Sequence, residues 1–562
     1  MSEPAAGATA QQPGAAEASA SAAEHTEAAA ASSYDAVPYS VHAFAQTRPD
    51  RLATVAALFG LESPDPQQCR VLELGCASGG NLIPMAAGNP QSRFVGIDLS
   101  ARQIADGQAV LRELGLGNVE LREGSILDID DSLGQFDYVL AHGVYSWVPP
   151  AVQERILEIC ARNLSPRGVA YVSYNTYPGW HARGAVREML WYHTQRFADP
   201  LTRIREARAL LVFMARAMPG AGGAFGTLLR QELALLLATP DTYLLHEHLE
   251  EFNEPLYFHQ FAQRAAACGL QYLGETQVGT MVAGRLGADT EKTLRQISPD
   301  LLHMEQYMDF LRNRMFRQTL LCHAEVRLER ALRPEAVMRF HVSSSAKPVS
   351  AAPEVRSDGG EAFAGGSKQK LTTRDPLMKG AMVWLWERAP ASAPFDAVLE
   401  AARERAGVAS APEQAMQLAT RLLHCYVSQL VDFSLAPPKS CEQVSERPIA
   451  SPYARLRARQ GDRVTNLRLE TVTMSEPTRL VLQHLDGRHD RAALESLVIE
   501  WLATLPKGAQ GDSTAEPPST AERSTATLPT APPPAGPPPE ERARHFVDQV
   551  LAGFARAALL VG

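Results

Sequence analysis

Residues Val71 to Asn81 read VLELGCASGGN, and this stretch is the strongest indication of the fold. Its first residues are an apolar run that predicts a short buried strand, and the small residues after it predict a tight turn into a helix. Further along the chain, RFVGIDLS predicts a second strand that ends at Asp98. A small-residue turn after one strand and a carboxylate at the end of the next are features with which doubly wound α/β sheets bind a nucleotide.

Strand and helix patterns alternate around this turn. The expected strands are Arg70–Leu74, Arg93–Ile97, Val119–Leu121, Phe136–Ala141 and Gly168–Tyr174, and the expected helices are Asn81–Ala87, Ala101–Leu114 and Val152–Asn163. Alternation at this pace predicts parallel βαβ units whose helices cover both faces of the sheet. A helix at Phe258–Cys268 and a strand at Leu270–Glu275 return to that sheet, so the helical stretch at about 183–250 predicts an inserted cap.

The chain of 562 residues is too long for one hydrophobic core and predicts several domains. The Ala-rich residues 1–33 carry almost no large apolar side chains, which predicts a disordered tail. We expect the α/β domain over 34–285, a helical middle region over 286–350, a Gly/Ser/Ala-rich linker over 351–370, a helical or winged-helix-like module over 371–440, and a C-terminal module over 441–562 that a Pro-rich flexible insertion at 506–539 interrupts.

The composition argues against several classes of protein. The net charge of −9 is unlike that of a dedicated nucleic-acid binder, so no nucleic-acid partner is expected. The 7 cysteines form no CxxC pair, which predicts neither a metal site nor disulfides and fits a reducing compartment. The N-terminal residues lack the basic and apolar regions of a signal peptide, and no apolar run is long enough for membrane insertion. We therefore expect a cytoplasmic protein.

The turn alone is compatible with two nucleotide ligands. Gly75-x-Ala77-x-x-Gly80 is compatible with the GxGxxG fingerprint of NAD-binding proteins. Glu73, just before the turn, would repel a pyrophosphate but suits a ligand with an ammonium and a sulfonium group. S-adenosyl-L-methionine has both groups and no phosphate, so the electrostatics favour this methyl donor.

The stretches ELGCASGG, GIDLS, EGSILDI and FDYVLAHGVYSWVP resemble, in order and spacing, the motifs of class I S-adenosylmethionine-dependent methyltransferases. SYDAVPY, SYNTYPGWHARG and YLLHEHLEEFNEPLYFHQFA more closely resemble a bacterial subgroup with a methyltransferase regulatory domain, which is similar to lysine methyltransferases acting on outer-membrane proteins. The resemblance covers about Tyr34 to Thr280. It implies a doubly wound, mostly parallel, Rossmann-like sheet of seven strands, followed by mainly α, winged-helix-like C-terminal domains.

The resemblance also implies how the donor is bound. Glu73, Gly75 and Gly79 would lie under the methionine moiety, and Asp98 would hold the ribose. Three more expected contacts are with the adenine and the methyl end, from Ser125, Ile126 and His142. Further donor contacts are expected from Tyr34, Gln46, Cys76, Ala77, Asn81 and Leu99, and Tyr39 and Thr47 are candidates for an N-terminal lid. The sequence departs from the family pattern at two positions, because Ala77 replaces a glycine and Ser125 replaces an acidic residue.

The acceptor side is expected after the fourth and fifth strands, at the carboxyl edge of the sheet. The candidates for catalytic roles there are His142, Tyr145, Asn175, Tyr177 and Trp180, with Trp147 and Tyr174 nearby. Aromatic rings can surround a sulfonium or a lysine ammonium through cation–π contacts. The alternative is that these rings only pack the cap against the sheet.

Two polar clusters elsewhere have simpler interpretations. His246 and His248 stand two positions apart, whereas helical zinc sites use residues four apart, so they are expected to be polar residues of an exposed or cap-lining helix. Arg312, Arg314 and Arg317 are expected on a solvated helix face.

We therefore expect a methyltransferase that transfers a methyl group in line to a lysine of a protein acceptor, with a cell-envelope protein as the candidate partner. Two alternatives stay open. One is a small-molecule acceptor with C-terminal domains that serve assembly, and the other is a non-catalytic nucleotide-binding regulatory protein.

Overall fold

The computed structural model describes Asp35, Val37 and residues 42–217, 223–366, 369–437, 440–441, 443–504, 528–532 and 537–561. The predicted tail 1–33, Tyr34, Tyr39 and most of the predicted insertion 506–539 lie outside the described residues.

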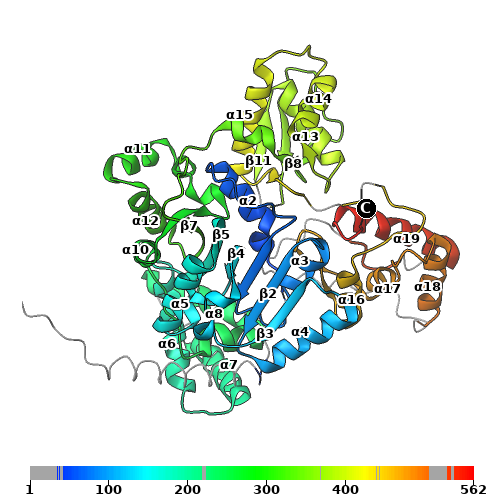
Figure 1. The fold of residues 1–562 in the computed structure, drawn as a ribbon. Coiled ribbons are helices and arrows are strands. Elements are labelled where there is room, and N and C mark those ends of the chain that lie inside the picture. Colours follow the sequence, from blue (N-terminus) through cyan, green and yellow to red (C-terminus); the bar gives the residue numbers. More distant parts are fainter. Residues whose placement is uncertain are drawn as a thin grey trace, which may run out of the picture.

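A seven-stranded sheet forms the centre of the N-terminal half, with strand order β3-β2-β1-β4-β5-β7-β6 (Figure 1). The strands are β1 Arg70–Leu74, β2 Arg93–Asp98, β3 Val119–Glu123, β4 Phe136–Ala141, β5 Leu164–Asn175, β6 Leu270–Glu275 and β7 Phe316–His323. Strands β1 to β5 pair in parallel, and β7 is antiparallel to both β5 and β6. The predicted doubly wound, mostly parallel sheet is confirmed.

Helices cover both faces of this sheet because neighbouring strand residues point to opposite sides. Val71 and Tyr138 pack on the side of α2 (Pro49–Leu58), α3 (Leu82–Gly88) and α4 (Ala101–Leu114). Leu72 and Val139 pack on the other side, with α5 (Pro150–Arg162) and α10 (Phe258–Ala267). All four side chains are fully buried, so the carboxyl edge of the central strands has a rigid base.

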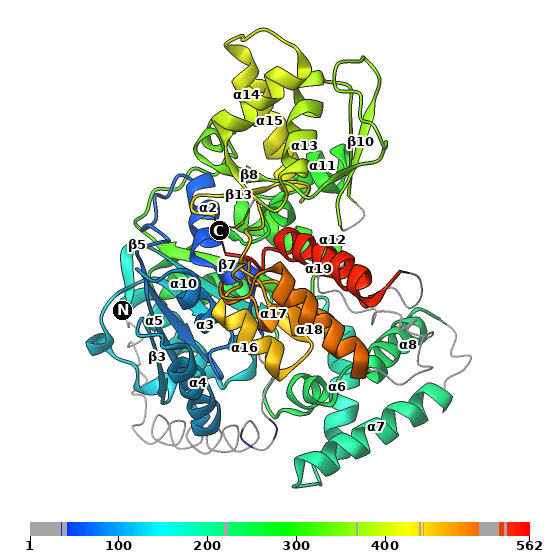
Figure 2. The same ribbon diagram turned by 90° about the vertical axis from the view of Figure 1, so that its right-hand side faces the viewer.

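The cap lies between β5 and α10, as predicted, and has a hydrophobic core of its own. It consists of α6 (Trp180–Thr194), α7 (Pro200–Ala217), α8 (Gly223–Ala238), α9 (Asp241–Leu244) and a π-helical turn, η5 (Leu245–Leu249). Figures 1 and 2 show α7 and α8 at the lower end of the molecule, away from α13–α15.

The middle region differs from the expected purely helical segment. Helices α11 (Ala288–Ile297) and α12 (Leu301–Arg312) are followed by β7, which was not predicted as a strand. Strand β7 inserts between β5 and β6, so the α/β domain extends beyond the expected boundary at 285.

Of the three arginines predicted on a solvated helix face, Arg314 and Arg317 instead belong to an ion-pair cluster beside the sheet, which we call the Arg317 cluster, and Arg312 donates to the Thr280 and Val282 carbonyl oxygens. The Arg317 guanidinium is buried and lies 2.6 to 3.0 Å from carboxylate oxygens of Glu275, Glu305 and Asp309. Arg314 adds a contact of 3.0 Å to Asp309. Because β7 is an inner strand, Arg317 points into the protein, and its charge is balanced there by carboxylates.

Beyond β7 the chain forms two further modules. The first contains α13 (Pro376–Glu387), α14 (Phe395–Ala406), α15 (Glu413–Val427) and a small sheet of β8 (His341–Ser343), β12 (Ala393–Pro394) and β13 (Asp432–Ser434). The expected linker 351–370 is not simply a linker, because β10 (Glu361–Ala364) pairs there with β9 (Lys347–Pro348) and β11 (Lys370–Thr373).

The second module contains α16 (Pro452–Gln460), β14 (Arg463–Thr465), β15 (Thr471–Thr473), α17 (Glu476–Gln483), α18 (Arg491–Thr504) and α19 (Pro539–Arg556) (Figure 2). Both modules contact the α/β domain. Asp50 of α2 accepts hydrogen bonds from Ser434 Oγ and from the Leu435 backbone N–H, and Arg459 of α16 pairs with Glu113. Within the described ranges, none of the helices combines the length and apolar character that a membrane-spanning helix requires.

Candidate active site

The turn after β1 has the geometry that the small residues predict. Gly75, Ala77 and Gly79 adopt positive φ angles of 70°, 49° and 73°. A Cβ atom at Gly75 would lie 2.4 Å from Val144 Cγ2, so a larger residue would be strained and would also clash. The turn therefore keeps its backbone close to the residues that follow β4.

Glu73 is a buried carboxylate with an incomplete set of partners. Asn81 Nδ2 donates a hydrogen bond to Glu73 Oε1 at 2.7 Å, whereas the buried Oε2 has no hydrogen-bond partner among the described residues. Burial raises the pKa of Glu73 to about 8, although the bond from Asn81 opposes this shift. A bound cation would give Oε2 its missing partner, so Glu73 fits the ammonium group of S-adenosylmethionine.

Asp98 ends β2 and faces the same turn. Its Oδ2 accepts the Ala77 backbone N–H at 2.8 Å, and its Oδ1 accepts the Ser100 backbone N–H at 3.0 Å. Burial raises the pKa of Asp98, and the two backbone bonds oppose that rise. These bonds hold the carboxylate toward the cavity, where its remaining lone pairs suit the two hydroxyls of a ribose.

Glu73 and Asp98 line one cavity of about 270 Å³ at the carboxyl edge of the sheet. The predicted site residues that line it are Glu73, Gly75, Cys76, Ala77, Asn81, Asp98, Leu99, Ile126, His142 and Asn175. Ser125 does not line it; its side chain accepts a hydrogen bond from the Leu127 backbone N–H, and its neighbours Gly124 and Ile126 form that part of the wall.

His142 follows β4 at the end of the cavity where the methyl group is expected. Its Nδ1 lies 2.8 Å from the Tyr171 hydroxyl and 3.2 Å from Ser173 Oγ. Burial lowers the pKa of His142 to about 4, so the ring is neutral at neutral pH. The rings of Phe44 and Phe316 lie 3.9 and 6.3 Å from it, between centroids. This end of the cavity is therefore aromatic and free of a competing positive charge from His142.

Several predicted residues do not line the cavity. Tyr145 is fully buried in the core, where its ring meets Phe261 at 5.3 Å between centroids, because its side chain points to the α5 and α10 side of the sheet. Tyr177 stacks on His181, and Trp180 packs edge-on against Trp147, which does line the cavity.

Two other residues that were predicted to contact the donor do not line the cavity themselves. Gln46 hydrogen-bonds to the hydroxyl of Tyr171, the residue that contacts His142. Gly79 shapes the turn from behind, where a Cβ atom would lie 2.9 Å from Leu121. Thr47, a candidate for the lid, contacts Asn81 instead and so helps to orient the amide that holds Glu73.

A group of residues from distant segments also lines the cavity and was not predicted to do so. They include His42, Phe44, Gln103, Val144, His246, Glu247 and Phe316. His246 was expected in a cap-lining or exposed helix, and it lines the cavity while its Nε2 lies 2.7 Å from the Val37 carbonyl oxygen. Within the described part of the chain, no group of three or more metal-ligating side chains is present. The sequence feature that could have identified the cap residues of this group is the polar run HEHLEE in an otherwise apolar cap.

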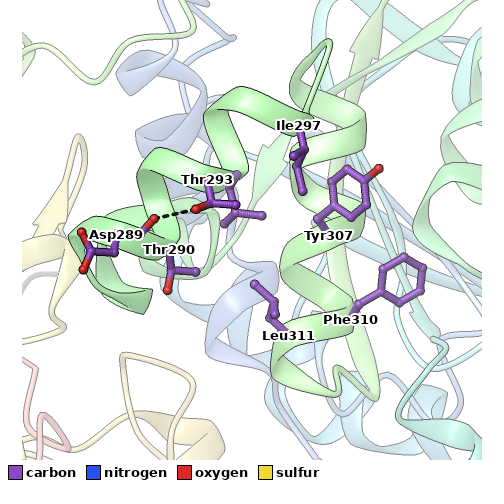
Figure 3. A pocket seen from close by; sticks show the side chains of 8 residues that line it. Asp289, Thr290, Thr293, Ile297, Tyr307, Phe310 and Leu311 are labelled. Atoms are coloured by element: carbon purple, nitrogen blue, oxygen red, sulfur yellow. Dashed lines mark hydrogen bonds between the residues drawn. The ribbon is translucent and has the colours of Figure 1, made fainter.

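A second cavity of about 380 Å³ lies between α11 and α12 (Figure 3). Its lining is mostly apolar, with Ile297, Tyr307, Phe310 and Leu311 around it, and Thr293 Oγ1 donates to the Asp289 carbonyl oxygen at its rim. None of the predicted site residues lines this cavity, so the candidate active site is the cavity at the sheet edge.

Comparisons with known proteins identify the domains of the chain. Residues 72–170 match the family model of a methyltransferase domain, residues 240–323 a predicted methyltransferase regulatory domain, and residues 446–531 the C-terminal winged helix domain of PKMT. An uncharacterized protein of Rickettsia prowazekii is 35% identical over 473 residues, which are 83% of this chain and 85% of that protein.

Solved structures extend the likeness to the fold. PKMT2 from Rickettsia typhi is 30% identical, with a TM-score of 0.80 over 93% of this chain and 100% of that chain. The same protein in complex with AdoHcy gives a TM-score of 0.79. The protein is thus an enzyme that uses S-adenosyl-L-methionine. It belongs to the class I S-adenosylmethionine-dependent methyltransferases of the bacterial subgroup that carries a methyltransferase regulatory domain.

Proposed function

We propose that this enzyme methylates lysine side chains of a protein acceptor that belongs to the cell envelope. The observation that carries the proposal is that the likeness to PKMT2 includes the C-terminal modules and covers all of that chain. Transfer to a small molecule requires only the α/β domain with its cap, whereas the further modules add surface for a macromolecule. The resemblance of the cap to lysine methyltransferases of outer-membrane proteins supports the same acceptor class.

The residues of the cavity fit this reaction. S-adenosylmethionine supplies a methyl group that is activated by a positive sulfur. In this proposal Glu73 binds the ammonium and Asp98 binds the ribose, which fixes the donor relative to the sheet edge. The rings of Phe44, Trp147 and Phe316 line the cavity, exclude water and suit a cationic side chain.

The test is incubation of the enzyme with isotopically methyl-labelled S-adenosylmethionine and, in separate reactions, an outer-membrane protein extract or a pool of small metabolites. Tryptic mass spectrometry should find lysine residues that gain labelled methyl groups in the protein reaction. A Glu73→Gln variant in the same reactions controls for contaminating methyltransferases. Label confined to the metabolite pool, or to residues other than lysine, would contradict the proposal.

A further inference from the structure

Among the described residues, three acidic side chains line the cavity, and the proposed function assigns two of them to the donor. In the proposed function, Glu73 binds the donor's ammonium group and Asp98 binds the ribose. The third is Glu247, which comes from the cap and not from the sheet. A carboxylate in a largely apolar cavity is costly unless a cation or hydrogen-bond donor compensates it. Glu247 therefore needs a partner that the donor-binding residues do not supply.

The local structure holds Glu247 at the cavity wall. It is the central residue of η5, and single π-helical turns of this kind occur frequently at functional sites. Its neighbours anchor the turn: Leu245 and Leu249 are fully buried in the cap core, and His246 is held between the Val37 carbonyl and Glu250 at 2.7 and 3.0 Å. The backbone position of Glu247 is thus fixed from both sides.

The Glu247 carboxylate itself is available to bind a ligand. In the described residues it makes no hydrogen bond and no ion pair within 4.0 Å, and the side chain is only half-buried beside the cavity. Arg183 of α6 interacts electrostatically with Glu247, but its guanidinium contacts Glu232 at 3.2 Å and lies over the Trp180 ring at 5.6 Å. Arg183 therefore has a carboxylate partner of its own.

We propose that Glu247 binds the cationic nitrogen of the acceptor and accepts one of its protons before methyl transfer. This inference rests on the proposed function, because it requires an amine acceptor such as lysine. An ammonium nitrogen cannot attack a methyl group, since its lone pair is occupied by a proton. The proton moves from nitrogen to a Glu247 oxygen, which leaves a neutral amine and a neutral carboxylic acid in the cavity.

Methyl transfer to the neutral amine then forms one bond and breaks another. The amine lone pair forms the new nitrogen–carbon bond while the carbon–sulfur bond breaks, and its electron pair stays on sulfur. The positive charge thereby passes from sulfur to the methylated nitrogen. Glu247 then holds the proton until the product leaves, when solvent takes it up.

The charges around Glu247 suit a proton acceptor at neutral pH. Burial raises the pKa of Glu247 to about 7, and the interactions with Arg183 from α6 and His246 from η5 oppose the rise. Tyr243 of α9 also interacts electrostatically with Glu247. A carboxylate whose pKa is close to the working pH can both accept and release a proton readily.

The experiment compares Glu247→Gln and Glu247→Asp with the wild-type enzyme. Methylation of lysine in the outer-membrane protein extract is followed at saturating S-adenosylmethionine, and S-adenosylhomocysteine binding is measured by calorimetry. Glu247→Gln keeps the shape but cannot take the proton, so kcat/KM for the acceptor should fall by about 100-fold. Binding of S-adenosylhomocysteine should stay within twofold. Glu247→Asp should recover part of the lost rate.

The pH profile separates a proton acceptor from a residue that only shapes the wall. In the wild type, kcat/KM should decrease as the pH falls below about 7, and Glu247→Gln should lack this decrease. Glu251→Gln is the matched control, because Glu251 is an exposed carboxylate next to the same turn and should leave rates unchanged.

The possible failures are distinguishable. If the wild type methylates no lysine in the extract, the proposed function fails and this inference fails with it. If the wild type methylates lysine and Glu247→Gln does so at the same rate, only the inference on Glu247 is overturned. A loss of S-adenosylhomocysteine affinity as large as the loss of rate would instead make Glu247 a donor ligand and would also overturn it.

Discussion

Two buried glutamates at the edge of the same sheet differ in where their positive partner comes from. Glu275, at the end of β6, accepts hydrogen bonds from Arg317, Thr319 and the Gln318 backbone, so its cation is built into the fold. Glu73 in β1 is just as buried, yet it has one bond from Asn81 and a second oxygen without a partner in the described residues. The comparison indicates that a buried carboxylate with its own arginine is structural, and that one without a cation is suited to a ligand.

The largest expected effect comes from removing the built-in cation. Arg317→Met leaves three carboxylates of the Arg317 cluster with only Arg314 beside them, so the free energy of unfolding should fall by about 3–5 kcal/mol. Denaturant unfolding, followed by fluorescence, measures this loss. Arg295→Met is the control, because its pair with Glu291 is exposed and should be worth less than about 1 kcal/mol. Equal losses for both variants would show that the Arg317 cluster is not stabilising.

Glu73→Gln should show the opposite pattern. It should weaken donor binding strongly, whereas the free energy of unfolding of the ligand-free protein should stay the same or increase. Losing a charge-assisted contact of about 1.5–3 kcal/mol should weaken S-adenosylmethionine binding by about 10- to 150-fold, as measured by calorimetry. The control is Glu113→Gln, an exposed carboxylate outside the cavity. A variant that binds the donor as tightly as the wild type would remove Glu73 from the site.

The sign of the stability change follows from the pKa of Glu73, which burial raises to about 8 in the folded protein from an ordinary value of 4.5. Between these values the folded state holds more protons than the unfolded state, so the wild type loses stability as the pH rises toward 8. Glu73→Gln carries no such charge and should be at least as stable as the wild type in thermal unfolding at pH 8. Donor affinity of the wild type should rise from pH 6 to 8, whereas that of the variant should stay flat.

Asp98→Ala should reduce donor affinity less than Glu73→Gln does, because a ribose offers hydroxyl groups and no charge. We expect affinity to fall by about 1–3 kcal/mol, the scale of lost hydrogen bonds to a charged group. Calorimetry with S-adenosylmethionine checks this, and Asp106→Ala, on the exposed side of α4, is the matched control. Unchanged affinity would mean that Asp98 only supports the turn.

The smallest expected effect concerns the turn between these two acids. Ala77 has a φ of 49°, a conformation that favours glycine, so Ala77→Gly should raise the free energy of unfolding by at most about 1 kcal/mol. Ala109→Gly, in the middle of α4, should instead lower it by about 1 kcal/mol. Thermal unfolding of both variants tests the contrast, which would be lost if they shifted in the same direction.

The part of the cavity that contains Glu73 and Asp98 could be predicted because its residues belong to two consecutive strand ends in the sequence. A strand, a small-residue turn and a carboxylate at the next strand end fix both backbone and side chain, so Glu73, Asp98 and most of the turn lie where the sequence places them. The position after a strand does not fix a side chain's direction, however. Tyr145 follows β4 as His142 does, yet it turns into the core.

The rest of the cavity was harder to predict because it assembles from distant segments. Phe44, Glu247 and Phe316 meet at one cavity only after the sheet, the cap and β7 have packed together. Strand β7 was missed because it enters the sheet out of chain order. Consequently Arg317, which would be solvated on an isolated helix, is buried by pairing that local patterns do not reveal.

The place of β7 also limits the order in which the protein can assemble during synthesis. Residues 176–315 separate β5 from β7, and β6 reaches the sheet only by pairing with β7. The ribosome must therefore release the chain to about residue 323 before the last two strands can join the first five. Until then, one edge of β5 has no strand beside it. The nascent enzyme thus exposes an unpaired strand edge while its cap is synthesised, and such an edge can pair with another chain and aggregate.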